Sequence, residues 1–194
     1  MKRTIAMLVL AGIAAFAFAG GAAESESGED TSLQYILDKG ELVLGLDDSF
    51  PPMGFRGEDG EIVGFDIDLA KEVTDRLGVE LRLQPIDWDA KVLDLNSKDI
   101  DVIWNGLTIT AEREEQITFS KPYIANRQIV IVQAGSGLMT KSDLAGKTIG
   151  LQLGSSAQDA VESEPEVLDS FAEVARYQDN VQALLDLEVG RIDA

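Results

Sequence analysis

The feature that most constrains the fold of this chain is an alternation of short apolar strands with amphipathic helices. The stretch ELVLGL (41–46) is apolar on both faces, as is typical of a strand inside a parallel sheet. The pattern that follows predicts, in chain order, a helix over 66–77, a strand over 79–86, a helix over 88–98 and a strand over 100–105. Strand–helix–strand alternation of this kind predicts an α/β fold built on a parallel sheet.

The first of these helices has a clear apolar periodicity. Leu69, Val73 and Leu77 recur at intervals of four residues and are expected to face the core. Gly78 is expected to end this helix, because glycine readily takes the left-handed conformation of a helix C-terminus. A short helix is also expected earlier in the chain, over 32–39.

A second unit with the same alternation follows. The expected elements are a β-branched hinge strand over 127–133, a strand ending at 152, a helix over 155–163, a strand over 172–177 and a helix over 179–190. In the last helix, Val181, Leu184 and Leu185 are expected to face inward.

Two stretches of the second unit echo the first. GELVLGLDDS (40–49) resembles GKTIGLQLGS (146–155), and LNSKDIDV (95–102) resembles LEVGRIDA (187–194). The similarity is either a chance match between short α/β segments or the mark of two lobes built on one plan. We interpret it as two βαβ lobes.

Composition removes several classes of function. The 194 residues include no cysteine and no histidine, which excludes disulfides, thiol nucleophiles, Cys/His zinc sites and histidine acid–base chemistry. No metal, no cofactor and no catalytic residue are expected. The formal net charge of −19 argues against nucleic acid or an anionic membrane surface as a partner.

The N-terminus has the pattern of an export signal. A basic MKR is followed by a short apolar run, and Ala17-Phe18-Ala19 matches an A-x-A cleavage site, so residues 1–19 are expected to be removed. The alternative is a membrane anchor, for which the run is short. No cysteine follows that could carry a lipid anchor. Residues 20–31 are expected to be a flexible acidic linker.

Polar and aromatic residues follow the ends of the predicted strands. In open parallel sheets, ligands bind outside the carboxyl ends of the strands, so these residues are expected to gather at one site. The set is Asp47 and Phe50 after the first strand, Trp88 after the second, Asn105, Gly106, Thr108 and Arg113 after the third, and Gly154, Ser155 and Ser156 in the second unit. Each has a simpler alternative: the aromatic residues as core, Asp47 as a turn former, and Trp104 beside them as sheet packing.

Arg113 is the most informative member of this set. Thr110 is a plausible N-cap, so Arg113 lies in the first turn of a helix, where acidic residues are normally favoured. A guanidinium fork beside helix-start amides suits a carboxylate. The alternative is a solvated arginine paired with Glu112 or Glu115.

These segments resemble the extracytoplasmic solute-binding proteins of bacterial polar amino acid ABC transporters, solute-binding protein family 3. The similarity rests on GFDIDLA, then IDVIWNGLTIT-x-ER, FSKPY and DLAGKTIGLQLGSSAQ, in that order. It implies a two-lobed α/β periplasmic-binding-protein fold of type II, with lobe 1 over 32–127 and a hinge strand plus lobe 2 over 128–194. It also implies that the second lobe and the C-terminal return to lobe 1 are incomplete.

The resemblance assigns roles to the first-lobe residues. Phe50 and Trp88 match positions that sandwich the ligand, and Asp47 matches one that contacts a polar ligand side chain. The Gly106 carbonyl is implied to accept from the α-ammonium group. The α-carboxylate is implied to bind Thr108 and Arg113, and Asn105 stands where other members often have serine.

In the second lobe, the resemblance implies that Gly154, Ser155 and Ser156 complete the carboxylate site with amide and hydroxyl donors. Ala157 stands where some members read the ligand side chain, and Gln158 follows it. This departure leaves glutamine, cystine and basic or acidic amino acids all open as ligands.

The implied function is capture of a free polar amino acid by lobe closure in the periplasm, followed by delivery to an inner-membrane ABC permease. The protein is expected to act as a monomer and not as an enzyme. Two alternatives are an extracytoplasmic amino acid sensor and a periplasmic dehydratase of the same fold. An acid that holds the ammonium group is expected beyond Ala194, so the 194-residue chain is expected to bind weakly and to aggregate readily.

Overall fold

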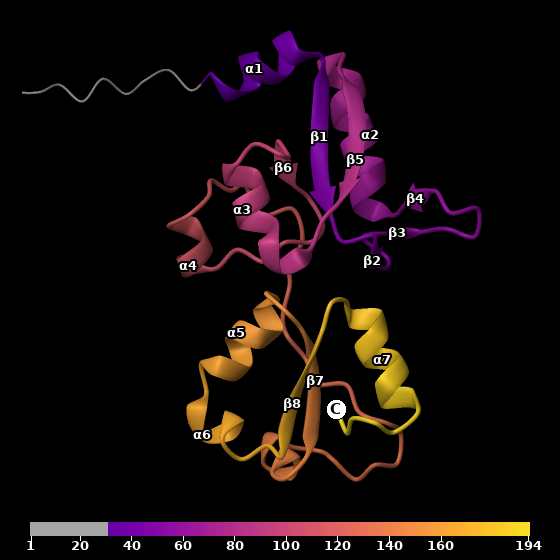
Figure 1. The fold of residues 1–194 in the computed structure, drawn as a ribbon, viewed down its shortest axis with the longest axis vertical. Helices are drawn as coiled ribbons and strands as arrows, with labels where there is room; N and C mark the ends of the chain where they lie inside the picture. Colours follow the sequence, from indigo (N-terminus) through magenta and orange to yellow (C-terminus); the bar gives the residue numbers. More distant parts are fainter. Residues whose placement is uncertain (1–30) are drawn as a thin grey trace, which may run out of the picture. The chain divides into compact units, whose positions relative to one another are not determined.

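A parallel sheet in the order β5–β1–β6 organises the first lobe (Figure 1). The computed structural model describes residues 31–194; the expected export signal and nearly all of the expected linker lie outside them. Strand β1 (Glu41–Leu46) is central, and β5 (Glu80–Pro85) and β6 (Val102–Ile103) flank it. Its central position explains why both of its faces are apolar: Val43, Leu44 and Leu46 are at most 1% exposed.

Helix α2 (Phe65–Leu77) covers this sheet, but with a different face from the one expected. The buried positions are Asp66, Ile67, Ala70 and Thr74, whereas Val73 is 36% exposed. The small side chain of Ala70 allows close packing on the sheet, and the Thr74 hydroxyl is satisfied by the Ala70 carbonyl at 3.0 Å. The predicted inward position of Val73 is therefore wrong. Gly78 ends the helix in the left-handed conformation, as expected.

The remaining elements of the first lobe are short. Helix α1 (Ser32–Lys39) precedes β1, and a small antiparallel sheet, not expected from the sequence, joins β2 (Ser49–Phe50), β3 (Gly54–Arg56) and β4 (Ile62–Val63). The expected second helix is a 3₁₀ turn, η1 (Trp88–Ala90), that continues into α3 (Lys91–Asn96). Helix α4 (Ala111–Glu114) is a single turn.

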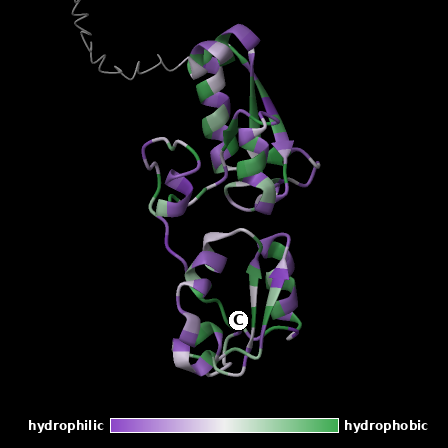
Figure 2. Ribbon diagram, turned by 60° about the vertical axis from the view of Figure 1, so that its left-hand side comes forward, coloured by the Kyte–Doolittle hydropathy of each residue, from purple (hydrophilic) through white to green (hydrophobic). Residues whose placement is uncertain are grey.

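The second lobe is built on two parallel strands, β7 (Thr148–Gln152) and β8 (Glu173–Tyr177). The 3₁₀ turn η2 (Lys141–Leu144) precedes β7, and α5 (Ser156–Glu162), α6 (Pro165–Leu168) and α7 (Asn180–Glu188) complete the lobe. Its core includes Leu144 and Ile149, and Figure 2 marks the central strands of both lobes as apolar.

Helix α7 also turns a different face inward. Leu187 is 6% exposed, whereas Leu184 is 46% and Leu185 55% exposed, so the predicted inward positions of these two leucines are wrong. The helix begins after Asp179, whose side chain accepts a hydrogen bond from the Gln182 backbone. Val181 is half-buried, in agreement with the prediction.

The sequence similarity between the two lobes corresponds to a similarity in structure, although one of the two matches is shifted by one residue. A Cβ added at Gly45 would lie 2.4 Å from Ile100, and one added at Gly150 would lie 2.4 Å from Ile192. Each strand therefore carries a glycine where an isoleucine from the returning chain crosses it. The pairing of Ile100 with Ile192 agrees with the sequence match, but Gly45 corresponds to Gly150, one residue away from the match read from the sequence.

The expected hinge strand over 127–133 is not a strand. None of these residues is paired in a β ladder, and Ile129 is 69% exposed. A strand needs a neighbour for its backbone groups, and no described segment supplies one here, so β-branched composition alone was misleading. Figure 1 shows a single extended connection between the lobes at this point. Within residues 31–194, no helix is long and apolar enough to cross a membrane.

Candidate ligand-binding site

The site residues expected from the sequence meet where the strand-end loops of the two lobes contact each other. Asp47 follows β1, and its carboxylate accepts a hydrogen bond from Gln152, the last residue of β7, at 2.7 Å. Arg113 reaches from α4 to the Gly154 carbonyl at 3.1 Å. The carboxyl ends of β1 and β7 therefore face the same site, as the parallel topology predicts.

Arg113 is buried, with 8% of its surface exposed. Its two terminal nitrogens donate to the carbonyls of Thr108 and Gly154, and Nη2 also contacts Asp159 Oδ2 at 3.2 Å. Thr110 caps the helix by accepting from the Arg113 backbone, as expected. The alternative of a solvated arginine paired with a neighbouring glutamate is excluded by this burial and by these partners.

Hydroxyl groups from both lobes lie beside Arg113. Thr108 Oγ1 and Ser156 Oγ are 3.0 Å apart, and the amides of Asn126 and Gln128 donate to these two oxygens. Ser155 caps α5, and its hydroxyl also donates to the Gln152 carbonyl at 2.7 Å. The Thr108–Ser156 pair thus presents two hydroxyl groups next to a guanidinium, which is a suitable environment for a carboxylate.

Gly154 is required where the lobes touch. Its φ of +64° lies in the left-handed region, and an added Cβ would be 2.8 Å from the Asp89 backbone of the first lobe. The contact between this loop and η1 therefore depends on the absence of a side chain at position 154.

Asp47 is the buried acidic residue of the site, and it contacts the second lobe through Gln152. It is 7% exposed, and burial is the main cause that raises the pKa of its carboxyl group; hydrogen bonds from Ser49 and Gln152 oppose this shift, and nearby Asp179 and Asp48 add to it. The bond from the Ser49 backbone shows that Asp47 also acts as a turn former, so both interpretations of this residue apply.

Gln152 was not expected as a site residue. It is 3% exposed, its amide nitrogen donates to Asp47 and to the Gln178 carbonyl, and its oxygen accepts from Asn180. The sequence feature that could have identified Gln152 is its position as a polar residue at the carboxyl end of an apolar strand. These bonds hold the Gln152 amide against Asp47 from the second lobe.

The aromatic residues and Gly106 lie around this interface. Phe50 is half-buried, and a Cβ added at Gly106 would lie 3.5 Å from its ring. Trp88 is 8% exposed, and the Lys91 ammonium lies 5.2 Å from its ring centroid. Trp104 packs against the first-lobe core, as expected, and meets the Tyr123 ring edge-on.

Asn105 supports the loop that carries Asp47. It is 2% exposed, and its side-chain oxygen accepts from the Asp47 backbone at 3.3 Å. Its amide nitrogen would be 2.7 Å from a Cβ at Gly54, so the side chain points into the lobe and braces the loop that carries Asp47.

Lys91 is the second residue that sequence reasoning missed. It is 4% exposed, and its ammonium donates to the Trp88 carbonyl at 2.9 Å and to the Gly154 carbonyl at 2.8 Å. Burial, followed by repulsion from Arg113, lowers the pKa of Lys91 to about 8. A single lysine at a helix start has no sequence feature that separates it from a surface lysine.

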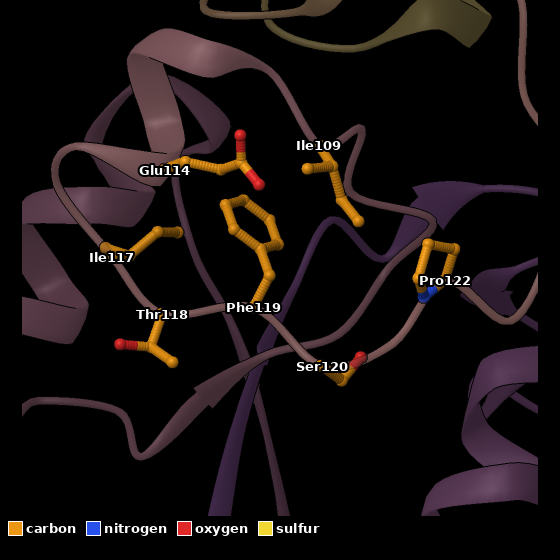
Figure 3. A pocket seen from close by; sticks show the side chains of 7 residues that line it. All are labelled: Ile109, Glu114, Ile117, Thr118, Phe119, Ser120 and Pro122. Atoms are coloured by element: carbon orange, nitrogen blue, oxygen red, sulfur yellow. The ribbon is translucent and has the colours of Figure 1, made fainter.

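A hollow on α4 and the segment after it is separate from this site. Figure 3 shows Phe119 pointing into the space between Glu114 and Ile109. The other lining residues are Ile117, Thr118, Ser120 and Pro122. None of the residues expected to bind ligand lines it. Within residues 31–194, no cluster of acidic side chains is suited to hold a metal ion.

Two α/β lobes with charged, hydroxyl and aromatic side chains at their facing strand ends define a two-lobed binding protein. The chain belongs to the bacterial extracellular solute-binding proteins, family 3, whose sequence profile matches residues 42–191. It is 35% identical over 187 residues to the L-cystine-binding protein TcyJ of Escherichia coli (strain K12), covering 95% of this chain and 69% of that protein.

Two further proteins are similar to this chain over most of its length. The arginine-binding extracellular protein ArtP of Bacillus subtilis (strain 168) is 32% identical over 195 residues, which cover 100% of this chain and 72% of ArtP. The crystal structure of an ABC uptake transporter substrate-binding protein from Streptococcus pneumoniae, with bound histidine, superposes with a TM-score of 0.81 at 41% identity; the match covers 84% of this chain and 68% of that one.

Proposed function

We propose that this protein binds a free amino acid between its two lobes in the periplasm and delivers it to the permease of an ABC transporter. The observation that carries the proposal is that a buried arginine and a buried carboxylate, Arg113 and Asp47, both bridge the lobes. A zwitterion with a polar side chain presents groups of both signs, so it can engage both residues at once.

Different groups of the site would bind the carboxylate, the ammonium group and the side chain of the ligand. The α-carboxylate would bind Arg113, Thr108 and Ser156, whose donors converge at the lobe boundary. The Gly106 carbonyl would accept from the α-ammonium group, and Phe50 beside it would contact the apolar part of the side chain. Some of these groups make contacts within the protein: Thr108 with Ser156, and Arg113 with the Gly154 carbonyl. A bound ligand would compete with these contacts.

The position of Asp47 indicates which ligand side chains the site would prefer. The Asp47 carboxylate and the Gln178 carbonyl both accept hydrogen bonds from the Gln152 side-chain amide, so they lie close together. They suit a ligand side chain that carries donors, such as a guanidinium or imidazole group. The names of ArtP and of the histidine complex from Streptococcus pneumoniae are in line with this class.

Catalysis and nucleic acid binding are not part of the proposal. TcyJ and ArtP are named as binding proteins, and the chain has no histidine or cysteine for acid–base or nucleophilic steps. A sensor module would use the same ligand site, so transporter and sensor differ in their partner. We propose a monomeric carrier that docks on a permease.

A ligand screen tests the proposal. Thermal unfolding of the complete protein would be measured with each of the twenty common amino acids and L-cystine. A ligand at 100 times its Kd should stabilise the protein by about 2.7 kcal/mol. We expect a shift with one or a few amino acids that have donor-bearing side chains. If no amino acid shifts the transition, the proposed function is wrong.

Transport is tested separately, in cells. Deleting the gene should abolish uptake of the amino acid identified in the screen. Uptake that persists unchanged, together with a ligand-dependent signalling response, would favour the sensor over the carrier.

A further inference from the structure

Lys91 is a buried cation with no anionic partner among the residues that the structure describes. Its residue surface is 4% exposed, and both acceptors of its ammonium group are neutral carbonyls, those of Trp88 and Gly154. No carboxylate in the described chain forms an ion pair with it. Buried charges in proteins are normally paired, because removing a charge from water is costly.

A second cation lies beside it. Arg113 donates to the same Gly154 carbonyl oxygen as Lys91, so the guanidinium and the ammonium group converge on one atom. Of the two, only Arg113 has an ion-pair partner, Asp159 at 3.2 Å, and that carboxylate is 44% exposed. The lobe boundary thus holds two buried cations and one partly solvated anion.

Three charged groups from three elements surround the Lys91 ammonium. Arg113 on α4 lowers the pKa of Lys91, whereas Asp89 on η1 and Asp159 on α5 raise it. Burial outweighs both acids. The site is therefore arranged so that an added negative charge would stabilise the ammonium form.

We propose that Lys91 is a second cationic contact for the carboxylate of the bound ligand, beside Arg113. The inference rests on the proposed function, since it requires a ligand with a carboxylate group. An ammonium group has three N–H donors, and two of them are taken by Trp88 and Gly154. The third is available for a carboxylate oxygen. Arg113 would hold the carboxylate in a planar fork, and Lys91 would add a point charge.

The consequence is proton uptake on binding. Where Lys91 is buried against Gly154 and no ligand carboxylate is near, its pKa is lowered to about 8, so near pH 8 a substantial fraction of the side chain is neutral. A bound carboxylate favours the ammonium form, so binding at this pH would take up protons from the buffer. Affinity would fall as the pH rises above 8.

Calorimetry on the wild-type protein and Lys91→Met tests this. L-arginine, L-histidine and L-cystine would each be titrated at pH 7 and pH 9.5, and at pH 8 in buffers of different ionisation enthalpy. We expect Lys91→Met to weaken binding at pH 7 by about 10-fold or more, as for the loss of a charged hydrogen bond. We expect this ratio to shrink at pH 9.5, and the variant to lack the wild-type proton uptake at pH 8.

The matched control is Lys71→Met, which removes the same charge from the exposed face of α2. Its affinity and proton uptake should equal those of the wild type. Lys91→Arg is the second variant: it keeps the cation but does not titrate near pH 8, so it should retain binding and lose the part of the pH dependence that comes from Lys91, while the part that comes from the ligand's own α-ammonium group stays. Lys91→Arg also tests the proposal if Lys91→Met does not fold.

The outcomes separate the two proposals. If the wild type binds none of the three amino acids and none from the screen, the proposed function fails. If it binds and Lys91→Met binds within threefold at pH 7, or takes up the same number of protons at pH 8, only the role of Lys91 fails. A lower melting temperature of the ligand-free Met variant, with affinity reduced equally at both pH values, would identify Lys91 as a structural clamp on Gly154.

Discussion

The carboxylate of Asp101 accepts a hydrogen bond from the backbone N–H of Val43 at 2.7 Å, while the Asp101 backbone donates to the Val43 carbonyl at 2.8 Å. Asp193 makes the same pair of bonds with Thr148 in the second lobe, at 2.9 and 2.8 Å. Each aspartate fastens the returning chain to the central strand of its lobe. The two lobes therefore share this aspartate contact as well as a parallel strand pair, β1–β5 in the first lobe and β7–β8 in the second.

The first prediction concerns these two aspartates. Asp101→Ala should lower the free energy of unfolding by about 1–3 kcal/mol, because a buried backbone N–H loses its acceptor. Asp193→Ala should cost less, because the Asp193 side chain is 41% exposed whereas that of Asp101 is 6% exposed. Urea unfolding measures both. Equal losses at the two positions would contradict the argument from burial.

The second prediction concerns Arg113. Arg113→Ala should weaken amino acid binding by at least the 1.5–3 kcal/mol typical of a charged hydrogen bond, and Arg113→Lys nearly as much, because lysine lacks the fork. Calorimetry measures the loss. Arg76→Ala, which removes an exposed arginine that pairs with Glu72, is the matched control. Affinity of Arg113→Ala within threefold of wild type would refute the carboxylate assignment.

The third prediction concerns Asp47. Its folded pKa is raised, so the folded protein binds more protons than the unfolded chain between the ordinary value of 3.8 and the raised value. Stability should fall as the pH rises through this window, and the loss should persist at neutral pH. Asp47→Asn should therefore be more stable than wild type at pH 7 without ligand, and the difference should vanish below pH 4.

The same variant should bind less tightly. If Asp47 receives a donor of the ligand side chain, Asp47→Asn should lose about 1.5–3 kcal/mol of affinity for that ligand. Thermal unfolding across pH and calorimetry at pH 7 check the two parts separately. A variant that is less stable at pH 7 would show that the carboxylate is mainly structural.

The fourth prediction concerns lobe contact. Gly154→Ala should weaken ligand binding, because the added methyl group would meet the Asp89 backbone and keep the lobes apart. Gly190→Ala is the control: its φ of +74° imposes similar backbone strain, but a Cβ there meets nothing within 4 Å. Both variants should lose similar stability, and only Gly154→Ala should lose affinity. Small-angle scattering with ligand would report the failure to close.

The strands and the strand-end residues could be predicted because their signals are local. ELVLGL is apolar on both faces because β1 lies between two parallel neighbours, and Asp47 and Arg113 follow strands of this sheet. Helix orientation was harder. Leu184 and Leu185 have the right spacing to face inward, but the face that packs on the rest of the lobe carries Leu187 instead, and this depends on contacts distant in sequence.

Gln152 and Lys91 could not be recognised because their environment comes from distant parts of the chain. Gln152 meets Asp47 across 105 positions of sequence, and Lys91 meets Gly154 across 63. The strand predicted over 127–133 was wrong because composition alone does not form a strand. Its composition favours a strand, but no described segment pairs with it.

The contacts between the site residues of the two lobes have a consequence for selectivity. Asp159 contacts Nη2 of Arg113, and the Gln152 amide donates to one oxygen of the Asp47 carboxylate, so a ligand that binds these groups would have to replace contacts within the protein. The apparent Kd rises in proportion as the fraction of open, competent molecules falls. A compound that replaces only one of the two internal partners gains little, whereas one that replaces both is favoured. The contacts between the lobes would thus set a threshold that partial mimics of the ligand do not reach.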